Sequence, residues 1–181
     1  MSEFSLDLLK MGNVIAYKNE GKGIFGKAIV RKQLAKGYSK EDAQYTHVEI
    51  SLGEQHSINV APPKAKFIEI TKKHAGRYIK ILEYKHDHDN KRYKVAALYA
   101  ALCSNQAYDI AGILSFIFKW FKQNNRLFFC SEAVTTAYQM VYSDPIPFYG
   151  EFPSAIYPAD FFLPYFFNVK WQGRIPKNGG K

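Results

Sequence analysis

The chain changes its pattern at a polar loop, KHDHDNK, residues 85–91. Before the loop, short segments rich in β-branched and aromatic residues alternate between apolar and polar positions, which is typical of half-buried strands. After the loop, apolar residues recur at helical spacing. Because strands and helices occupy separate stretches, the sequence predicts an α+β domain with an antiparallel sheet first and helices after it.

The first stretch is predicted to form a meander of about four or five antiparallel strands. A short helix, EFSLDLLKM, precedes them, and GIFGKAIVRKQLA indicates a basic helix between the first two strands. The strand candidates are residues 13–18, 45–53, 56–60, 66–70 and 78–84.

The second stretch predicts three helices, followed by a segment rich in proline and aromatic residues. The first helix carries an apolar stripe, the second is the apolar segment 107–121, and the third begins near Cys130 and runs to Tyr142. No linker or repeat divides the chain, so we expect one domain, 1–181, with 174–181 as a loose tail. The stripe of the first helix consists of Val95, Leu98, Tyr99, Leu102 and Cys103.

The 181 residues carry a net charge of +9. Positive charge favours anionic partners such as nucleic acid, anionic lipid or an acidic wall polymer, but scattered Lys and Arg residues argue against nucleic acid. The N-terminal segment carries Glu3 and Asp7 and lacks a long apolar core, so no signal peptide is expected. The longest apolar run, Ala111–Phe118, is too short to span a bilayer. We therefore expect a cytoplasmic chain without a transmembrane segment, and export that needs no signal remains open.

The two cysteines lie in different settings, and at this length two do not make a disulfide framework. Cys103 lies within a helix on an apolar stripe and is expected to be a core residue. Cys130 follows an extended apolar pair and begins a helix, where the peptide N–H groups and the helix dipole lower the pKa of a thiol. From this setting alone, Cys130 is either a nucleophile or a second packed cysteine.

Of the histidines, His47 has the setting of a catalytic base. It lies inside the strand YTHVEISLG, and a rigid strand would hold its imidazole in place. His86 and His88 alternate with aspartates, but nothing nearby completes a metal site, so a solvated loop is expected. His74 lies in a basic turn with no evident partner, and His56 begins a strand.

A third polar group should orient the imidazole of His47. If residues 45–53 pair with 56–60 through a three-residue turn, Glu49 faces Asn59 and both share the side of His47. A two-residue turn would move Asn59 to the other face. The sequence therefore predicts Asn59 as the orienting residue, with Glu49 as the second choice.

With His47 before Cys130, the chain resembles the circularly permuted branch of the NlpC-type, papain-like cysteine peptidases. This is the YiiX/YaeF-like group, of which lecithin retinol acyltransferase is a more distant relative. In this branch the strand with the histidine precedes the helix with the cysteine. Asn13 stands where the family's opening strand usually has Asp. Six segments in family order carry the resemblance: GNVIAYK, GIFGKAIVRKQL, YTHVEISLG, AYDIAGILSF, FFCSEAV and YPADFF.

The resemblance implies a permuted papain-like fold and a cysteine peptidase or amidase, with Cys130 as the nucleophile and His47 as its base. The third polar position falls at Asn59, where relatives often have Glu, so an amide would orient the base, as in papain. Tyr108 is implied as a residue that lines the site. This chemistry requires no metal or cofactor.

The resemblance also suggests a substrate. Relatives cut peptide bridges in bacterial cell walls, so the expected reaction is hydrolysis of an amide bond in a peptidoglycan peptide. The permuted branch also includes enzymes that act on lipid-linked acyl groups, and the segment Tyr142–Phe167 is either a roof over an apolar pocket or ordinary packing. A third possibility is a basic, non-catalytic binding module with a vestigial Cys/His pair. The sequence sets no oligomeric state.

Overall fold

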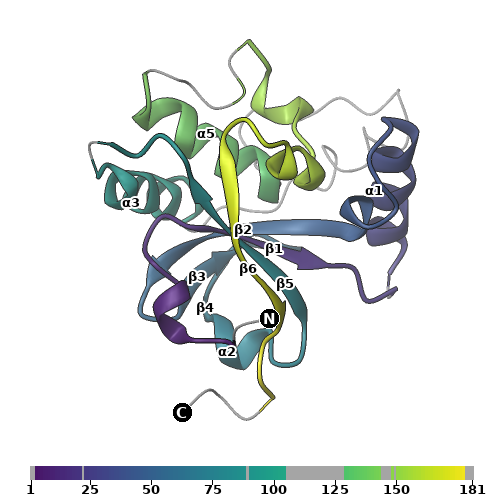
Figure 1. The fold of residues 1–181 in the computed structure, drawn as a ribbon, viewed down its shortest axis with the longest axis horizontal. Helices are drawn as coiled ribbons and strands as arrows, with labels where there is room; N and C mark the ends of the chain where they lie inside the picture. Colours follow the sequence, from purple (N-terminus) through teal and green to yellow (C-terminus); the bar gives the residue numbers. More distant parts are fainter. Residues whose placement is uncertain are drawn as a thin grey trace.

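The computed structural model describes residues 3–21, 23–88, 90–104, 129–143, 148 and 150–177. Within these residues the chain forms a six-stranded antiparallel sheet in the order β4-β3-β2-β1-β5-β6, with helices packed around it (Figure 1). The strands are β1 (Val14–Lys18), β2 (Tyr45–Gly53), β3 (His56–Asn59), β4 (Lys66–Glu69), β5 (Tyr78–Tyr84) and β6 (Phe167–Arg174).

The five strands predicted from the sequence are confirmed as β1 to β5. Their order is not a simple meander, because β1 pairs with both β2 and β5 and therefore lies inside the sheet. The sixth strand, β6, pairs with β5 and is not among the predicted strands. Its sequence FNVKWQGR contains β-favouring residues such as Val169 and Trp171, but an aromatic, proline-rich segment precedes it and obscures the signal.

The basic helix and two of the three later helices are also confirmed, as α1, α3 and α5. The predicted helix 107–121 lies outside the described residues. Because α1 separates β1 from β2 and β6 follows the helices, the order of strands first and helices after holds only for the middle of the chain. The helices are α1 (Ile24–Ala35), α2 (Ile70–Lys73), α3 (Arg92–Cys103) and α5 (Cys130–Val141), with the 3₁₀ helices η1 (Leu6–Leu8), η2 (Asp42–Gln44), η3 (Pro153–Ala155) and η4 (Pro158–Phe162).

The sheet separates two apolar cores, because alternate residues of each strand point to opposite faces. On one face, α3 and α5 pack against a core that includes Val14, Ala16 and Val48. On the other face, η1 and β6 contribute to a core around Ile15 and Tyr17. Figure 1 shows α3 and α5 on one side of the sheet and α2 on the other. The side chains of Val14, Val48 and Ile15 are buried, and each contributes about 1.5 to 3 kcal/mol to folding through burial of apolar surface.

Cys103 occupies the position that the sequence predicts. It ends α3 and is 1% exposed, in the core shared by α3 and α5. Burial raises the pKa of its thiol to about 12, so the thiol stays protonated at neutral pH. Cys103 is therefore a core residue.

The predicted loose tail, 174–181, begins inside packed structure. Arg174 ends β6, and Ile175 is buried. The amide of Ile175 donates to the carbonyl of Arg77, and its own carbonyl accepts from Gly76. Residues 178–181 lie outside the described part of the chain.

Among the described residues, no helix has both the length and the apolar character that crossing a membrane requires.

Candidate active site

His47 and Glu49 lie side by side on β2, on the face of the sheet away from α3 and α5. In the pairing of β2 with β1, Tyr17 is opposite His47 and Ile15 is opposite Glu49. Ile15 and Tyr17 belong to the core on that face, whereas Val48 points into the α3–α5 core. A spacing of two residues therefore places the imidazole and the carboxylate next to each other on one rigid strand.

Cys130 begins α5 and lies at the edge of β2 that faces away from β1. The amide of Ser51 donates to the carbonyl of Asn13, toward β1, so alternation along the strand directs the N–H of Val48 to the opposite edge. The described pairing between β2 and β3 covers the end of β2 from Ser51 onward and leaves the Val48 amide for another acceptor. The amides of Val48 and Ser131 both hydrogen-bond to Cys130, which lowers the pKa of its thiol.

The thiol of Cys130 and the imidazole of His47 interact through a hydrogen bond and through their charges. Burial opposes the thiolate, but the charge and hydrogen bond of His47 outweigh it and lower the pKa of Cys130 below its ordinary value. Burial also opposes the imidazolium, but Cys130 and Glu49 raise the pKa of His47 to about 9. Both shifts favour a thiolate–imidazolium pair, which titrates as a unit.

Glu49 contacts the other side of the His47 ring. Nε2 of His47 lies 2.9 Å from Oε1 of Glu49. The side chain of His47 is 15% exposed and that of Glu49 is fully buried. Because Nε2 faces the carboxylate, Nδ1 is the ring nitrogen left for Cys130. The carboxylate thus fixes the orientation of the ring and stabilises its charged form.

Glu49 is a buried carboxylate that three side chains approach as donors. Besides His47, the imidazole of His74 lies with Nε2 3.2 Å from Oε1, and the hydroxyl of Tyr17 donates to Oε2 at 2.9 Å. Burial would raise the pKa of this carboxyl group, but the hydrogen bonds from His47 and His74 lower it to about 2. Glu49 is therefore ionised at neutral pH.

His74 follows α2 and is buried, with 3% of its surface exposed. Nη1 of Arg77 lies 3.5 Å from Nδ1, and Nδ2 of Asn59 lies 3.4 Å from Nε2. Burial lowers the pKa of His74, and the opposing effect of Glu49 is smaller. The interpretation of His74 as a histidine without a partner is wrong, because β3, β4 and α2 fold it back onto Glu49.

The hairpin between β2 and β3 has a two-residue turn. Glu54 and Gln55 both have positive φ, 47° and 67°, as the first and second central residues of a type I′ turn require. This turn pairs Gly53 with His56. From the sequence, such a turn predicted that Asn59 would lie on the face away from His47.

A register shift in β2 nevertheless aligns Asn59 with Glu49, on the face of His47. The shift lies between Ser51 and Gly53, and after it Ser51 pairs with Ser57. Extending this register by two residues on each strand places Glu49 opposite Asn59. The short turn with its irregularity therefore produces the alignment expected from a three-residue turn.

The two predicted orienting residues therefore occupy different places in the cluster. Glu49, the second choice, makes the direct contact with His47, and the contact described for Asn59 is to His74. Tyr17 and His74 were not predicted as members of the site. Tyr17 lies on a predicted strand, but only the pairing of β1 with β2 reveals that it faces His47.

Of the remaining sequence-predicted positions, the described histidines lie away from Cys130. Tyr108 is outside the described residues. His56 stacks on Phe67, with ring centroids 5.0 Å apart. The rings of His86 and His88 are 6.2 Å apart, and among the described residues no group of three or more His, Cys, Asp or Glu side chains could hold a metal ion.

The described surroundings of Cys130 are largely apolar and closely packed. They leave a crevice of about 10 Å³, room for about one water molecule. The residues that line it together with Cys130 are Ile29, Phe129, Ser131, Ile156, Tyr157 and Pro158.

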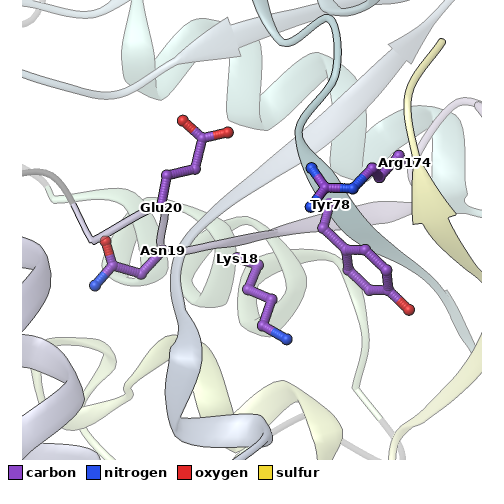
Figure 2. A pocket seen from close by; sticks show the side chains of 5 residues that line it. All are labelled: Lys18, Asn19, Glu20, Tyr78 and Arg174. Carbon is purple, nitrogen blue, oxygen red and sulfur yellow. The ribbon is translucent and has the colours of Figure 1, made fainter.

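A larger open hollow, of about 460 Å³, lies apart from this crevice and shares no lining residue with it. Figure 2 shows its five lining residues, with Glu20 and Asn19 on one side, Tyr78 and Arg174 on the other and Lys18 between them. Its charges are mixed, and its described lining residues include no cysteine, serine or histidine. The candidate active site is therefore the cluster around Cys130, where a cysteine and a histidine are in contact.

Comparison of the chain with protein-family models, with curated proteins and with solved structures gives no match in any of the three.

Proposed function

We propose that the chain is a cysteine hydrolase that cleaves an amide bond through a thioester intermediate. Cys130 is the nucleophile, His47 its base, and Glu49 the residue that orients His47. The observation that carries the proposal is the contact series from Cys130 through His47 to Glu49. A buried cysteine that only filled space would need neither an imidazole nor a buried carboxylate beside it.

The reaction follows from the charges in this series. The Cys130 thiolate attacks the carbonyl carbon, and the carbonyl oxygen becomes an oxyanion beside the peptide N–H groups at the start of α5. The His47 imidazolium gives its proton to the leaving amine as the C–N bond breaks, leaving a thioester. His47 then takes a proton from water, whose oxygen attacks the thioester; the C–S bond breaks, a carboxylic acid leaves and the thiolate–imidazolium pair is restored.

The fold proposed for this chemistry is the permuted papain-like one. Its support is the order of the elements, since β2 with His47 precedes α5 with Cys130, and α5 packs against β2. The resemblance of six segments to the NlpC-type group points the same way. By that resemblance the substrate is an amide bond in a bacterial cell-wall peptide.

A second candidate is an acyl-lipid hydrolase or acyltransferase with the same nucleophile. The apolar side chains beside Cys130, which include Ile29, Phe129 and Ile156, favour it, because an acyl group bound at Cys130 would lie against them and remove apolar surface from water. The chemistry to the thioester is the same. The two candidates differ in the substrate, a peptide amide or a lipid-linked acyl group, and in the acceptor that resolves the thioester.

The test is incubation of the protein with peptidoglycan muropeptides and, separately, with acyl-lipid vesicles, with products followed by mass spectrometry. We expect cleaved muropeptides from the native chain and none from Cys130→Ala, which should keep its circular dichroism spectrum. Deacylated lipid with intact muropeptides would replace the first candidate by the second. If neither substrate reacts and Cys130 is inert to alkylation, the chain is a binding module with a vestigial Cys/His pair.

A further inference from the structure

The carboxylate of Glu49 is shared by two imidazoles, of which the proposed reaction uses one. We propose that His74 is a positioning residue: a neutral hydrogen-bond donor, held in one tautomer by Glu49 and Arg77, that keeps Glu49 ionised and turned toward His47. This inference rests on the proposed function, because it assigns a role around the residue that orients the base.

The geometry brings His74 to the same oxygen that His47 contacts. Nε2 of His74 is 3.2 Å from Oε1 of Glu49, and Nε2 of His47 is 2.9 Å from that atom. His74 is 3% exposed and Glu49 is not exposed at all. A buried carboxylate loses the water that would solvate it, so each donor that the protein supplies decides whether the group stays charged.

The tautomer of His74 follows from Glu49 and is supported by Arg77. An ionised carboxylate can only accept, so the 3.2 Å contact with Oε1 places the proton of the neutral ring on Nε2. Nδ1 then keeps its lone pair, and the donor Nη1 of Arg77 faces it at 3.5 Å. The amide nitrogen of Asn59, 3.4 Å from Nε2, lies beside this N–H and is not hydrogen-bonded to it. Arg77 is itself anchored, because Nη2 donates to the carbonyl of Lys18 at 3.0 Å.

The neutral state of His74 is important for the charge of the cluster. A second imidazolium beside His47 would repel it, and the nearby charge of Arg77 also opposes protonation of His74. The ring is packed against Tyr17, with centroids 4.2 Å apart, and Asn59 approaches it from β3. His74 therefore faces one anion, two cations and two neutral groups, and donates to the anion without adding charge.

The test compares His74→Leu, which removes the donor, with His74→Gln, whose amide can still donate to Glu49. His56→Leu is the matched control, because His56 stacks on Phe67 on the outer part of the sheet and makes no described contact with Glu49. The measurement is the titration of the Glu49 side-chain carboxyl carbon by ¹³C NMR on the full-length folded protein, between about pH 3 and about pH 6.

We expect the native carboxyl to show no titration in this range and the His74→Leu carboxyl to titrate within it, a shift of about one to two pH units. His74→Gln should recover most of the native behaviour, and His56→Leu should match the native chain. An unshifted titration in His74→Leu would overturn the inference, and so would an equal shift in His56→Leu, which would mark a general structural effect.

A second measurement needs no variant and covers the case in which His74→Leu does not fold. ¹⁵N NMR of the histidine rings should show His74 neutral with its proton on Nε2 at neutral pH; a protonated ring or a proton on Nδ1 would overturn the inference. Neither measurement uses a substrate. Failure of the hydrolase proposal would therefore appear as absent turnover with the titration shift intact, and failure of this inference as turnover without the shift.

Discussion

His47 and Glu49 are two residues apart on β2, and Nε2 of the imidazole lies 2.9 Å from Oε1 of the carboxylate. One strand thus supplies both the proposed base and the carboxylate beside it, and strand alternation alone keeps them on the same face. Neither residue depends on a loop for its position. The third partner, Cys130, comes from the start of a helix on the other side of the sheet and meets His47 at the edge of β2.

Because of this contact, substitution of Glu49 should lower turnover more than substitution of Asn59, the other candidate orienting residue. We expect Glu49→Gln to lower kcat/KM by about 100-fold or more, because a neutral amide cannot stabilise the imidazolium. Asn59→Ala should lower it by less than about tenfold, since the described contact of Asn59 is to His74. The measurement is kcat/KM on whichever substrate the native chain cleaves.

The rate of Cys130 alkylation at neutral pH provides a check that needs no substrate. It should fall in Glu49→Gln and change little in Asn59→Ala. The opposite ranking of the two variants would return the orienting role to Asn59.

The two thiols should differ in reactivity. The pKa of Cys130 is lowered, chiefly by His47 acting against burial, whereas burial raises the pKa of Cys103 to about 12. Brief treatment of the folded protein with iodoacetamide should therefore label Cys130 well before Cys103. Peptide mass mapping measures the ratio, and preferential labelling of Cys103 would contradict the assignment.

The pH dependence of turnover should have its alkaline limb near the pKa of His47. Burial lowers this pKa, but Cys130 and Glu49 raise it from 6.5 to about 9, so the imidazolium that protonates the leaving group persists through neutral pH and is lost as the pH rises through about 9. Alkylation of Cys130 requires only the thiolate and should not fall above that pH. A fall in kcat/KM that begins near pH 6.5 would show that His47 is not stabilised as a cation.

Much of the fold could be predicted because its signals are local. Alternation in Tyr45–Gly53 and Tyr78–Tyr84 and the apolar stripe of α3 depend on neighbouring residues alone, and these elements are confirmed. β6 was missed because proline and aromatic residues precede it. Its place beside β5 depends on a pairing between segments about eighty residues apart in sequence, which no local pattern reveals.

In the candidate site, too, local signals predicted some residues, and long-range contacts brought in others that the sequence did not reveal. His47 and Cys130 were predicted from a strand, a helix start and a family resemblance. These signals depend on neighbouring residues or on the order of segments along the chain. The ranking of Asn59 over Glu49 depended on hairpin register, which a single irregularity in β2 can alter. Tyr17 joins the cluster through the pairing of β1 with β2, and His74 joins it through its contact with Glu49. Both bring together residues that are distant in sequence, for which the sequence contains no local signal.

Tyr17 should contribute to stability through the charge of its acceptor. Its hydroxyl donates to the carboxylate of Glu49 at 2.9 Å, whereas the equally buried hydroxyl of Tyr99 donates to the neutral carbonyl of Ile58 at 2.7 Å. We expect Tyr17→Phe to lower the free energy of unfolding by about 1.5 to 3 kcal/mol and Tyr99→Phe by about 1 kcal/mol. Urea denaturation at neutral pH measures both, and equal losses would mean that the charge of Glu49 adds nothing to its bond with Tyr17.

Among the described glycines, Gly12 should tolerate a side chain least, because it lies where β1, β2, α3 and α5 meet. Its amide donates to the carbonyl of Ser51, and its carbonyl accepts from the hydroxyl of Tyr138 on α5. Its φ is +84°, and a Cβ there would lie 2.6 Å from the carbonyl oxygen of Arg92. Gly37 has a similar φ, +92°, but a Cβ on it would meet nothing within 4 Å. A substitution at Gly37 therefore measures the backbone strain without a steric clash.

We expect Gly37→Ala to lower the free energy of unfolding by about 1 to 2 kcal/mol, the cost of a left-handed conformation for an alanine. Gly12→Ala should lose that amount and about 1 to 3 kcal/mol more, because Arg92 opposes the added Cβ with backbone atoms that cannot move without shifting α3. Urea denaturation of the two variants measures the difference. Equal losses would mean that the start of α3 yields to the added methyl group, and α3 would then be less firmly fixed against the sheet than its packing indicates.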